Sequence, residues 1–250
     1  MTDTILFLHA FPLDAWMWQP QIDALAGEAR LVAPDFPGFG GTKAAGDVMT
    51  MDAAADAAVR ALDEAGASDA VVCGLSMGGY VALAFWRRHR DRVTGLILAN
   101  TKAGADDDAG RDRRAALAQR LRSEGNQFLL DSPPPLLSDV ASDDLWEAVK
   151  ADIGRQPPDA IAAASLGMAE RVDSTGDLPH IDVPTLVIVS DGDTLIPAAA
   201  SIPMADLIPG AKLHDIQGAG HLSNLEQPER FSALLREHLV ACGGGGAVEG

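Results

Sequence analysis

The chain has 250 residues, of which 47% are hydrophobic and 22% are charged, a balance typical of one large globular domain. Its formal net charge of −17 argues against nucleic acids and anionic membranes as partners, because both are bound through basic patches. With only two cysteines, Cys73 and Cys242, no apolar run long enough to span a bilayer and no basic signal-peptide start, the chain is expected to be a reduced, cytoplasmic protein without disulfides.

Short apolar runs typical of strands alternate with longer helical segments along the chain. We expect strands at 5–8, 31–33, 71–73, 93–99, 185–190 and 212–216. We expect helices at about 16–26, 50–64, 77–88, after Pro197 and at about 228–240. Because the strands lack polar alternation, they predict an α/β fold with a parallel sheet covered on both faces. Ligands of such sheets bind at the carboxyl ends of the strands.

Residues 103–180 interrupt this alternation. They contain a charged helical pattern, a proline-rich connector and two further helical stretches, without a convincing strand. We therefore predict a core formed by 1–102 and 181–242, with 103–180 as a helical cap that shapes a pocket and excludes water. The alternative is that these helices only add stability. The glycine-rich tail 243–250 is predicted to be disordered.

The motif Gly74-Leu75-Ser76-Met77-Gly78 fits the pattern G-x-S-x-G and lies directly between a predicted strand and a predicted helix. Its glycines allow a sharp turn that would hold Ser76 exposed at the carboxyl end of the sheet, where a serine can act as a nucleophile. The alternative is a helix N-cap, a position that serine also favours. The strand–turn–helix setting favours the nucleophile.

A serine nucleophile requires a base, and the base requires an orienting acid. His221 lies on a glycine-flanked loop directly after the strand at 212–216, on the same edge of the sheet as Ser76. The other histidines fall in helical stretches expected to be exposed (His89 and His238), at surface or strand positions (His180 and His214), or near the N-terminus (His9).

Two carboxylates could serve as the acid. Asp191 and Asp193 both follow the strand at 185–190 on the same edge of the sheet. Either could instead be an ordinary turn residue.

Taken together, the segments LHAFPLDAWMW, PDFPGFGGT, GLSMGGY and GAGHLSNLEQPERF resemble the α/β-hydrolase superfamily. The resemblance is greatest to its branch of small serine esterases and 3-oxoadipate enol-lactonases. It covers nearly the whole chain, and it is weakest in 103–180. In this family the acid begins a D-x-x-x-P pattern, which Asp193 and Pro197 fit and Asp191 does not. The resemblance therefore implies a triad of Ser76, Asp193 and His221, in the chain order of that fold.

The resemblance also gives a role to His9-Ala10-Phe11-Pro12, which is similar to the family's His-Gly-x-x oxyanion loop, with Ala10 in place of the usual glycine. It implies that the backbone N–H groups of Phe11 and Met77 form an oxyanion hole, and that His9 is structural. Aromatic and leucine side chains that could line an acyl pocket, or equally pack in the core, are Trp16, Trp18, Phe128, Trp146, Leu195 and Leu222.

One departure from the family concerns the sheet. Only about four residues precede the strand at 5–8, where the fold normally has two further strands. We therefore expect a six-stranded sheet without the N-terminal hairpin. The strand at 31–33 would become an edge strand that must be covered, blunted or paired with a second subunit, so a homodimer is conceivable.

The resulting hypothesis is hydrolysis of a small carboxylic ester or lactone through an acyl-enzyme. No organic cofactor is required, and no cysteine–histidine spacing suggests a metal. A serine at this position argues against haloalkane dehalogenases and epoxide hydrolases of the fold, which use aspartate. Cofactor-free perhydrolase or haloperoxidase activity, C–C bond hydrolysis and acyl transfer remain alternatives on the same triad. So do a low-turnover receptor for a small molecule and an interaction protein with a vestigial triad.

Overall fold

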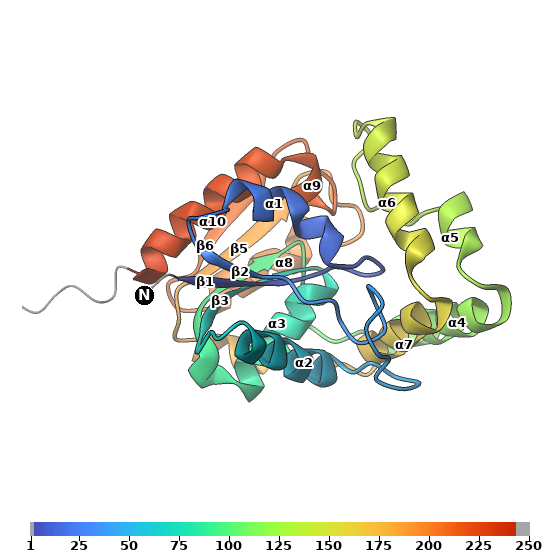
Figure 1. Cartoon of the computed structure of the whole chain (residues 1–250), viewed down its shortest axis with the longest axis horizontal. Helices are drawn as coiled ribbons and strands as arrows, with labels where there is room; N and C mark the ends of the chain where they lie inside the picture. Colours follow the sequence, from blue (N-terminus) through green and yellow to red (C-terminus); the bar gives the residue numbers. More distant parts are fainter. Residues whose placement is uncertain (1–2, 244–250) are drawn as a thin grey trace, which may run out of the picture.

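The computed structural model describes residues 3–243, which form a six-stranded sheet with helices on both faces (Figure 1). The strands are β1 (Thr4–Leu8), β2 (Arg30–Val32), β3 (Ala70–Leu75), β4 (Val93–Ala99), β5 (Thr185–Ser190) and β6 (Lys212–Ile216). Their order is β2-β1-β3-β4-β5-β6, and all neighbours are parallel. The predicted six-stranded parallel sheet is confirmed.

Helices cover both faces of the sheet, which explains why β1, β3 and β5 are buried at every residue. Figure 1 shows α1 (Gln19–Ala24) and α10 (Pro228–Gly243) together on one face, and α2 (Met51–Glu64) and α3 (Met77–Arg88) on the other. Shorter elements are η1 (Ala15–Trp18), η2 (Arg90–Arg92) and α9 (Ser223–Glu226), and α8 (Ala198–Leu207) packs against β5.

Local sequence signals explain where α2 begins and ends. The Thr50 hydroxyl accepts a hydrogen bond from the Ala53 amide, so Thr50 caps the N-terminus of the helix. Gly66 follows the helix with φ of 66°, a conformation that glycine adopts more readily than other residues.

The edge strand β2 is only three residues long and starts at Arg30, one residue earlier than predicted. The Arg30 guanidinium donates to the Gly66 carbonyl at 2.7 Å, which places a charged side chain beside this edge. A short edge strand that carries a charge offers little template for pairing with another chain.

The segment between β4 and β5 contains only helices among its described residues. They are α4 (Asp108–Glu124), α5 (Gln127–Asp131), α6 (Asp143–Arg155), α7 (Pro158–Ala169) and the short η3 (Thr175–His180). Helices α4 and α7 pack against each other, and Figure 1 shows α4 to α7 gathered at one end of the molecule, opposite the N-terminus.

At the other end of the chain, α10 runs three residues further than predicted and includes Gly243. The rest of the predicted disordered tail, 244–250, lies outside the described residues.

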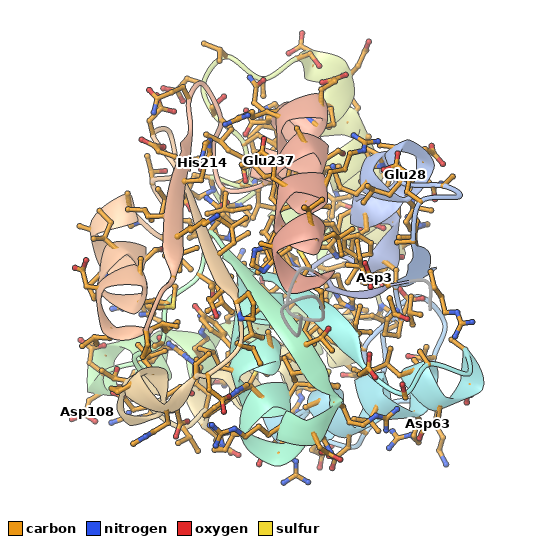
Figure 2. The ribbon with its side chains drawn as sticks, turned by 90° about the vertical axis from the view of Figure 1, so that its left-hand side faces the viewer. Asp3, Glu28, Asp63, Asp108, His214 and Glu237 are labelled. Carbon is orange, nitrogen blue, oxygen red and sulfur yellow. The ribbon has the colours of Figure 1, made fainter. Side chains whose placement is uncertain are left out.

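The acidic residues that give the chain its net charge are distributed over the surface. Figure 2 labels five of them on separate elements and loops: Asp3, Glu28, Asp63, Asp108 and Glu237. Many acidic residues form surface ion pairs with arginines, as between Arg88 and Asp56 at 2.8 Å. Pairs of this kind contribute little to stability because water screens them.

Candidate active site

Ser76 lies at the sharp turn between β3 and α3, with φ of 58° and ψ of −116°. Such a backbone conformation is strained for a residue with a side chain. Two hydrogen bonds to the backbone of Ser76 hold this conformation. The Ser76 N–H donates to the Ala99 carbonyl at 3.0 Å, and the Thr101 hydroxyl donates to the Ser76 carbonyl at 2.8 Å. Ser76 occupies the N-cap position of α3, but its side chain makes no capping hydrogen bond. Its hydroxyl therefore makes no hydrogen bond to the helix backbone.

The glycines around Ser76 permit very close packing. A Cβ at Gly74 would lie 2.1 Å from the Gly78 carbonyl oxygen, and one at Gly78 would lie 2.0 Å from the carbonyl oxygen of Leu8. The first contact joins the two sides of the turn, and the second joins α3 to the end of β1. Both flanking glycines of the motif are thus required by space.

His221 lies on the loop after β6, and its Nδ1 is 2.8 Å from Oδ2 of Asp193. The imidazole is fully buried. Its second nitrogen, Nε2, has no hydrogen-bond partner among residues 3–243. A buried nitrogen without a hydrogen-bond partner costs folding free energy. Because Nε2 is not engaged by the protein, it is free to accept a proton from a reacting group.

Asp193 lies after β5, and its carboxylate accepts hydrogen bonds from several directions. Oδ1 accepts from the Leu195 and Ile196 amides, both at 2.9 Å, while Oδ2 accepts from the Asn100 side chain at 3.0 Å. Burial acts to raise the pKa of Asp193, but the hydrogen bond and charge of His221, helped by Ile196 and Asn100, hold this pKa below its ordinary value. The carboxylate is therefore ionised beside the imidazole.

The second candidate acid, Asp191, points elsewhere. It is exposed, and its Oδ1 accepts from the Gly218 amide at 2.7 Å. This hydrogen bond joins the loop after β5 to the loop after β6, so Asp191 stabilises the conformation of these loops as an ordinary turn residue does.

Asn100 is a site residue that sequence reasoning missed. Its side chain donates to Asp193 and to the Ser190 hydroxyl at 2.6 Å, and its oxygen accepts from the Ser223 hydroxyl at 2.7 Å. A signal was available, since Asn100 directly follows β4 at the carboxyl edge of the sheet, as Ser76 follows β3. Asn100 thereby joins the ends of β4 and β5 and orients Asp193.

The amide groups of Phe11 and Met77 have no hydrogen-bond acceptor within the described part of the chain. Met77 is the first residue of α3, where N–H groups have no partner inside the helix. Phe11 follows β1, and this loop is held by His9, whose Nδ1 donates to the Ala10 carbonyl at 3.1 Å while Nε2 accepts from the Phe36 amide at 3.0 Å. Burial lowers the pKa of His9 to about 4, so the ring is neutral and structural at pH 7.

A pocket of about 360 Å³ opens above Ser76. Its lining includes Phe11 and Pro12 from the loop after β1, Tyr80 from α3, and Leu195 and Ile196 from the loop after β5. The other lining residues come from the loop after β4, from α4, α5 and α7, and from the connector after α5: Lys102, Asp106, Gly110, Arg113, Arg114, Leu117, Leu129, Pro134, Leu136 and Met168. The lining therefore combines an apolar surface with a group of charged side chains.

Of the side chains proposed for an acyl pocket, Leu195 lines this pocket and the others do not. Trp18 packs between Phe7 and Phe231 in the core, and Leu222 is fully buried. The remaining three, Trp16, Phe128 and Trp146, are partly buried against the core. His238, expected to be exposed, is also buried, because α10 lies on one face of the sheet with His238 close to Gly95 of β4.

A polar junction joins α6 to the loop that follows Phe11. The Asp14 amide donates to Oδ2 of Asp152 at 3.1 Å, and the Gln156 side chain donates to Oδ2 of Asp14 at 2.8 Å and accepts from the Gly40 amide at 3.1 Å. Burial, together with the nearby charge of Asp14, raises the pKa of Asp152 to about 7. The position of α6 is thus linked to the loop that carries the Phe11 amide.

Comparison with known proteins gives a consistent result. Residues 5–234 match the profile described as the alpha/beta hydrolase family. The chain is 30% identical to a pimeloyl-[acyl-carrier protein] methyl ester esterase from Aromatoleum aromaticum, over 93% of this chain and 96% of the relative. It is 28% identical to 3-oxoadipate enol-lactonase 1 from Acinetobacter baylyi, over 92% and 86%.

Among solved structures, a thermophilic esterase from Thermogutta terrifontis with malate bound is 40% identical and superposes with a TM-score of 0.93, over 96% of this chain and 90% of that one. Among residues 3–243, none of the helices combines the length and the apolar character that a membrane span requires. The same residues contain no cluster of three or more histidine, cysteine, aspartate or glutamate side chains that could bind a metal ion.

Proposed function

Because the chain belongs to the alpha/beta hydrolase family, as its sequence motifs predicted, we propose that it is a serine hydrolase of small carboxylic esters or lactones. The observation that carries this proposal is the buried His221–Asp193 pair, whose free imidazole nitrogen lies on the same edge of the sheet as the uncapped hydroxyl of Ser76. The similarity to an esterase and an enol-lactonase supports the substrate class.

In the proposed mechanism, Nε2 of His221 takes the proton from the Ser76 hydroxyl as its oxygen attacks the substrate carbonyl. Asp193 keeps the proton of the imidazole on Nδ1 and stabilises the imidazolium that forms. His221 then returns the proton to the leaving alcohol, and the same groups activate the water that cleaves the acyl-enzyme.

The developing oxyanion would be bound by the N–H groups of Phe11 and Met77, which are otherwise unpaired within residues 3–243. Donors that are already oriented toward the position of the charge stabilise the transition state without reorganisation. Loss of one such donor typically costs about 10²–10³ in kcat.

We further propose that the segment 103–180 acts as the cap of this site. Most of the side chains that wall the pocket opposite Ser76 come from its helices and connectors. Such a cap restricts the size of the acyl group and keeps bulk water from the acyl-enzyme.

The test is multiple-turnover hydrolysis of p-nitrophenyl esters from acetate to octanoate, and of simple lactones, by the wild type and by Ser76→Ala. We expect kcat to fall by at least about 10³-fold in the variant, because a serine nucleophile acts as one unit with its base. Ser68→Ala, at an exposed position, is the matched control and is expected to retain full turnover.

Turnover that persists in Ser76→Ala would refute the assignment of the nucleophile. One cycle of product release per molecule of wild type, with no further turnover, would favour a low-turnover receptor.

A further inference from the structure

The pocket above Ser76 is rich in positive charge, although the chain as a whole carries a net charge of −17. Lys102, Arg113 and Arg114 line it, and Asp106 is the one acidic side chain among its lining residues. The buried guanidinium of Arg171 lies directly behind Asp106, at 3.0 Å. Lys102, Arg113, Arg114 and Arg171 therefore outnumber the one carboxylate of Asp106, and the formal charges of these five side chains sum to +3.

Asp106 is already saturated by these neighbours. Its Oδ1 lies 3.0 Å from Arg171 and 3.4 Å from Lys102, and its Oδ2 lies 3.1 Å from Arg114. Partial burial acts to raise the pKa of Asp106, but Arg171 and Arg114 hold this pKa well below its usual range. Asp106 thus has no capacity left to neutralise a further cation.

Arg113 differs from the other arginines of α4. Arg111 pairs with Asp108, Arg114 with Asp106 and Arg120 with Glu124, while Arg122 donates to a backbone carbonyl. Arg113 is exposed, and it takes part in none of the ion pairs or hydrogen bonds of residues 3–243.

The position of Arg113 on its helix aims it at the pocket. Gly110, Arg113, Arg114 and Leu117 are spaced at i, i+3, i+4 and i+7, so they share one face of α4, and all four line the pocket. An unpaired guanidinium on that face is available to a ligand inside the pocket.

We propose that the substrate is an ester or lactone that carries a free carboxylate apart from its scissile bond, and that Arg113 binds this carboxylate. The inference rests on the proposed function and adds a specificity residue to it. The fork of N–H groups on a guanidinium matches the two oxygens of a carboxylate. Leu117, Leu129 and Leu136 supply an apolar wall for the carbon chain between the two polar ends of the substrate.

Local positive charge is also needed on electrostatic grounds. A surface with a net charge of −17 repels anions at long range, and a cationic cleft offsets this repulsion where the substrate enters. Because Arg113 is exposed, its attraction for a carboxylate is open to screening by salt.

The test compares monomethyl esters of succinic, glutaric and adipic acids with the methyl esters of their monoamides, which have nearly the same shape without the charge. Release of methanol is followed for the wild type, Arg113→Gln, Arg113→Lys and Arg120→Gln. Arg120→Gln is the matched control, because it removes one charge from the same helix at a side chain that stacks on Phe128 outside the pocket.

For at least one chain length, we expect kcat/KM of the wild type for the acid to exceed that for the amide by about tenfold or more, as one charged hydrogen bond warrants. Arg113→Gln should remove most of this preference and leave the amide within about twofold, Arg113→Lys should keep part of it, and added salt should weaken it. Equal rates for acid and amide in the wild type, or the same loss in Arg120→Gln, would overturn the proposal.

A binding measurement separates this inference from the proposed function. Calorimetry with Ser76→Ala should show binding of glutarate or adipate that disappears in Ser76→Ala/Arg113→Gln. Hydrolysis that survives in Ser76→Ala would refute the serine mechanism, whereas the binding result would still decide the role of Arg113. Absence of binding, or tighter binding of 4-phosphonobutanoate than of glutarate, would overturn the carboxylate assignment.

Discussion

Replacing Gly78 by alanine should reduce both stability and turnover, because α3 approaches β1 too closely for a methyl group. The added Cβ would lie 2.0 Å from the Leu8 carbonyl oxygen and 3.0 Å from that of His9, whereas ordinary contacts begin at 3.4 Å. Both oxygens belong to the backbone and cannot rotate away, so α3 and β1 must separate by about an ångström. Overpacking of this kind costs about 1–3 kcal/mol, and the rigid backbone places this case near the upper end.

Helix propensity acts in the opposite direction, since alanine is favoured over glycine by about 1 kcal/mol inside a helix. We therefore expect a net loss of about 2 kcal/mol and a fall in Tm of roughly 4–8 °C. The same displacement separates the amides of Met77 and Phe11, and a shift of that size can lower kcat by about 10²-fold.

Urea unfolding and steady-state hydrolysis of p-nitrophenyl acetate measure the two effects. Gly176→Ala is the control, because a Cβ there has no atom within 4 Å and the residue does not have a positive φ. It should leave stability and turnover nearly unchanged. A Gly78→Ala protein with the unfolding midpoint and turnover of the wild type would refute the close approach of α3 to β1.

Two further predictions concern carboxylates. Asp193→Asn should lower kcat by about 10⁴-fold, because the imidazole of His221 loses the partner that orients it. Asp191→Asn is the control and should change kcat little. Equal effects of the two substitutions in steady-state assays would contradict the assignment of Asp193 as the acid. The folded-state pKa of Asp152, about 7, lies above the ordinary pKa of an aspartate. The folded protein therefore holds this proton more tightly than the unfolded chain, and the contribution of the proton to stability falls as pH rises from about 4 to 7. Relative to the wild type, Asp152→Asn should become more stable over that range, as measured by urea unfolding at each pH. A stability difference that stays constant with pH would contradict the buried contact of Asp152 with Asp14.

The strands, the turn at Ser76 and the loop of His221 could be predicted because their signals are local. Gly74 and Gly78 flank a serine between an apolar run and a helical pattern, and this local pattern was enough to predict the sharp turn. The six-stranded sheet followed in the same way, since each buried strand is a short apolar run bounded by turn residues.

The choice between Asp191 and Asp193 shows where local signals end. Both lie on one turn after β5, and only the packing of the loop after β6 brings His221 within 2.8 Å of one of them while Gly218 takes the other. The D-x-x-x-P resemblance pointed to the same residue, but composition and spacing did not distinguish the two.

The pocket depended most on the tertiary structure. The tryptophans and Phe128 were natural sequence candidates, yet they pack against the core. The pocket is lined instead by Phe11, Tyr80, several leucines and the charged residues of α4 and of the loop before it. The local pattern of α4 does not show which of its arginines line the pocket with Ser76. That depends on how α4 and α7 pack together and on where they lie relative to the end of β3. The chain by itself therefore determined the chemistry of the turn, and long-range packing decided which side chains surround it.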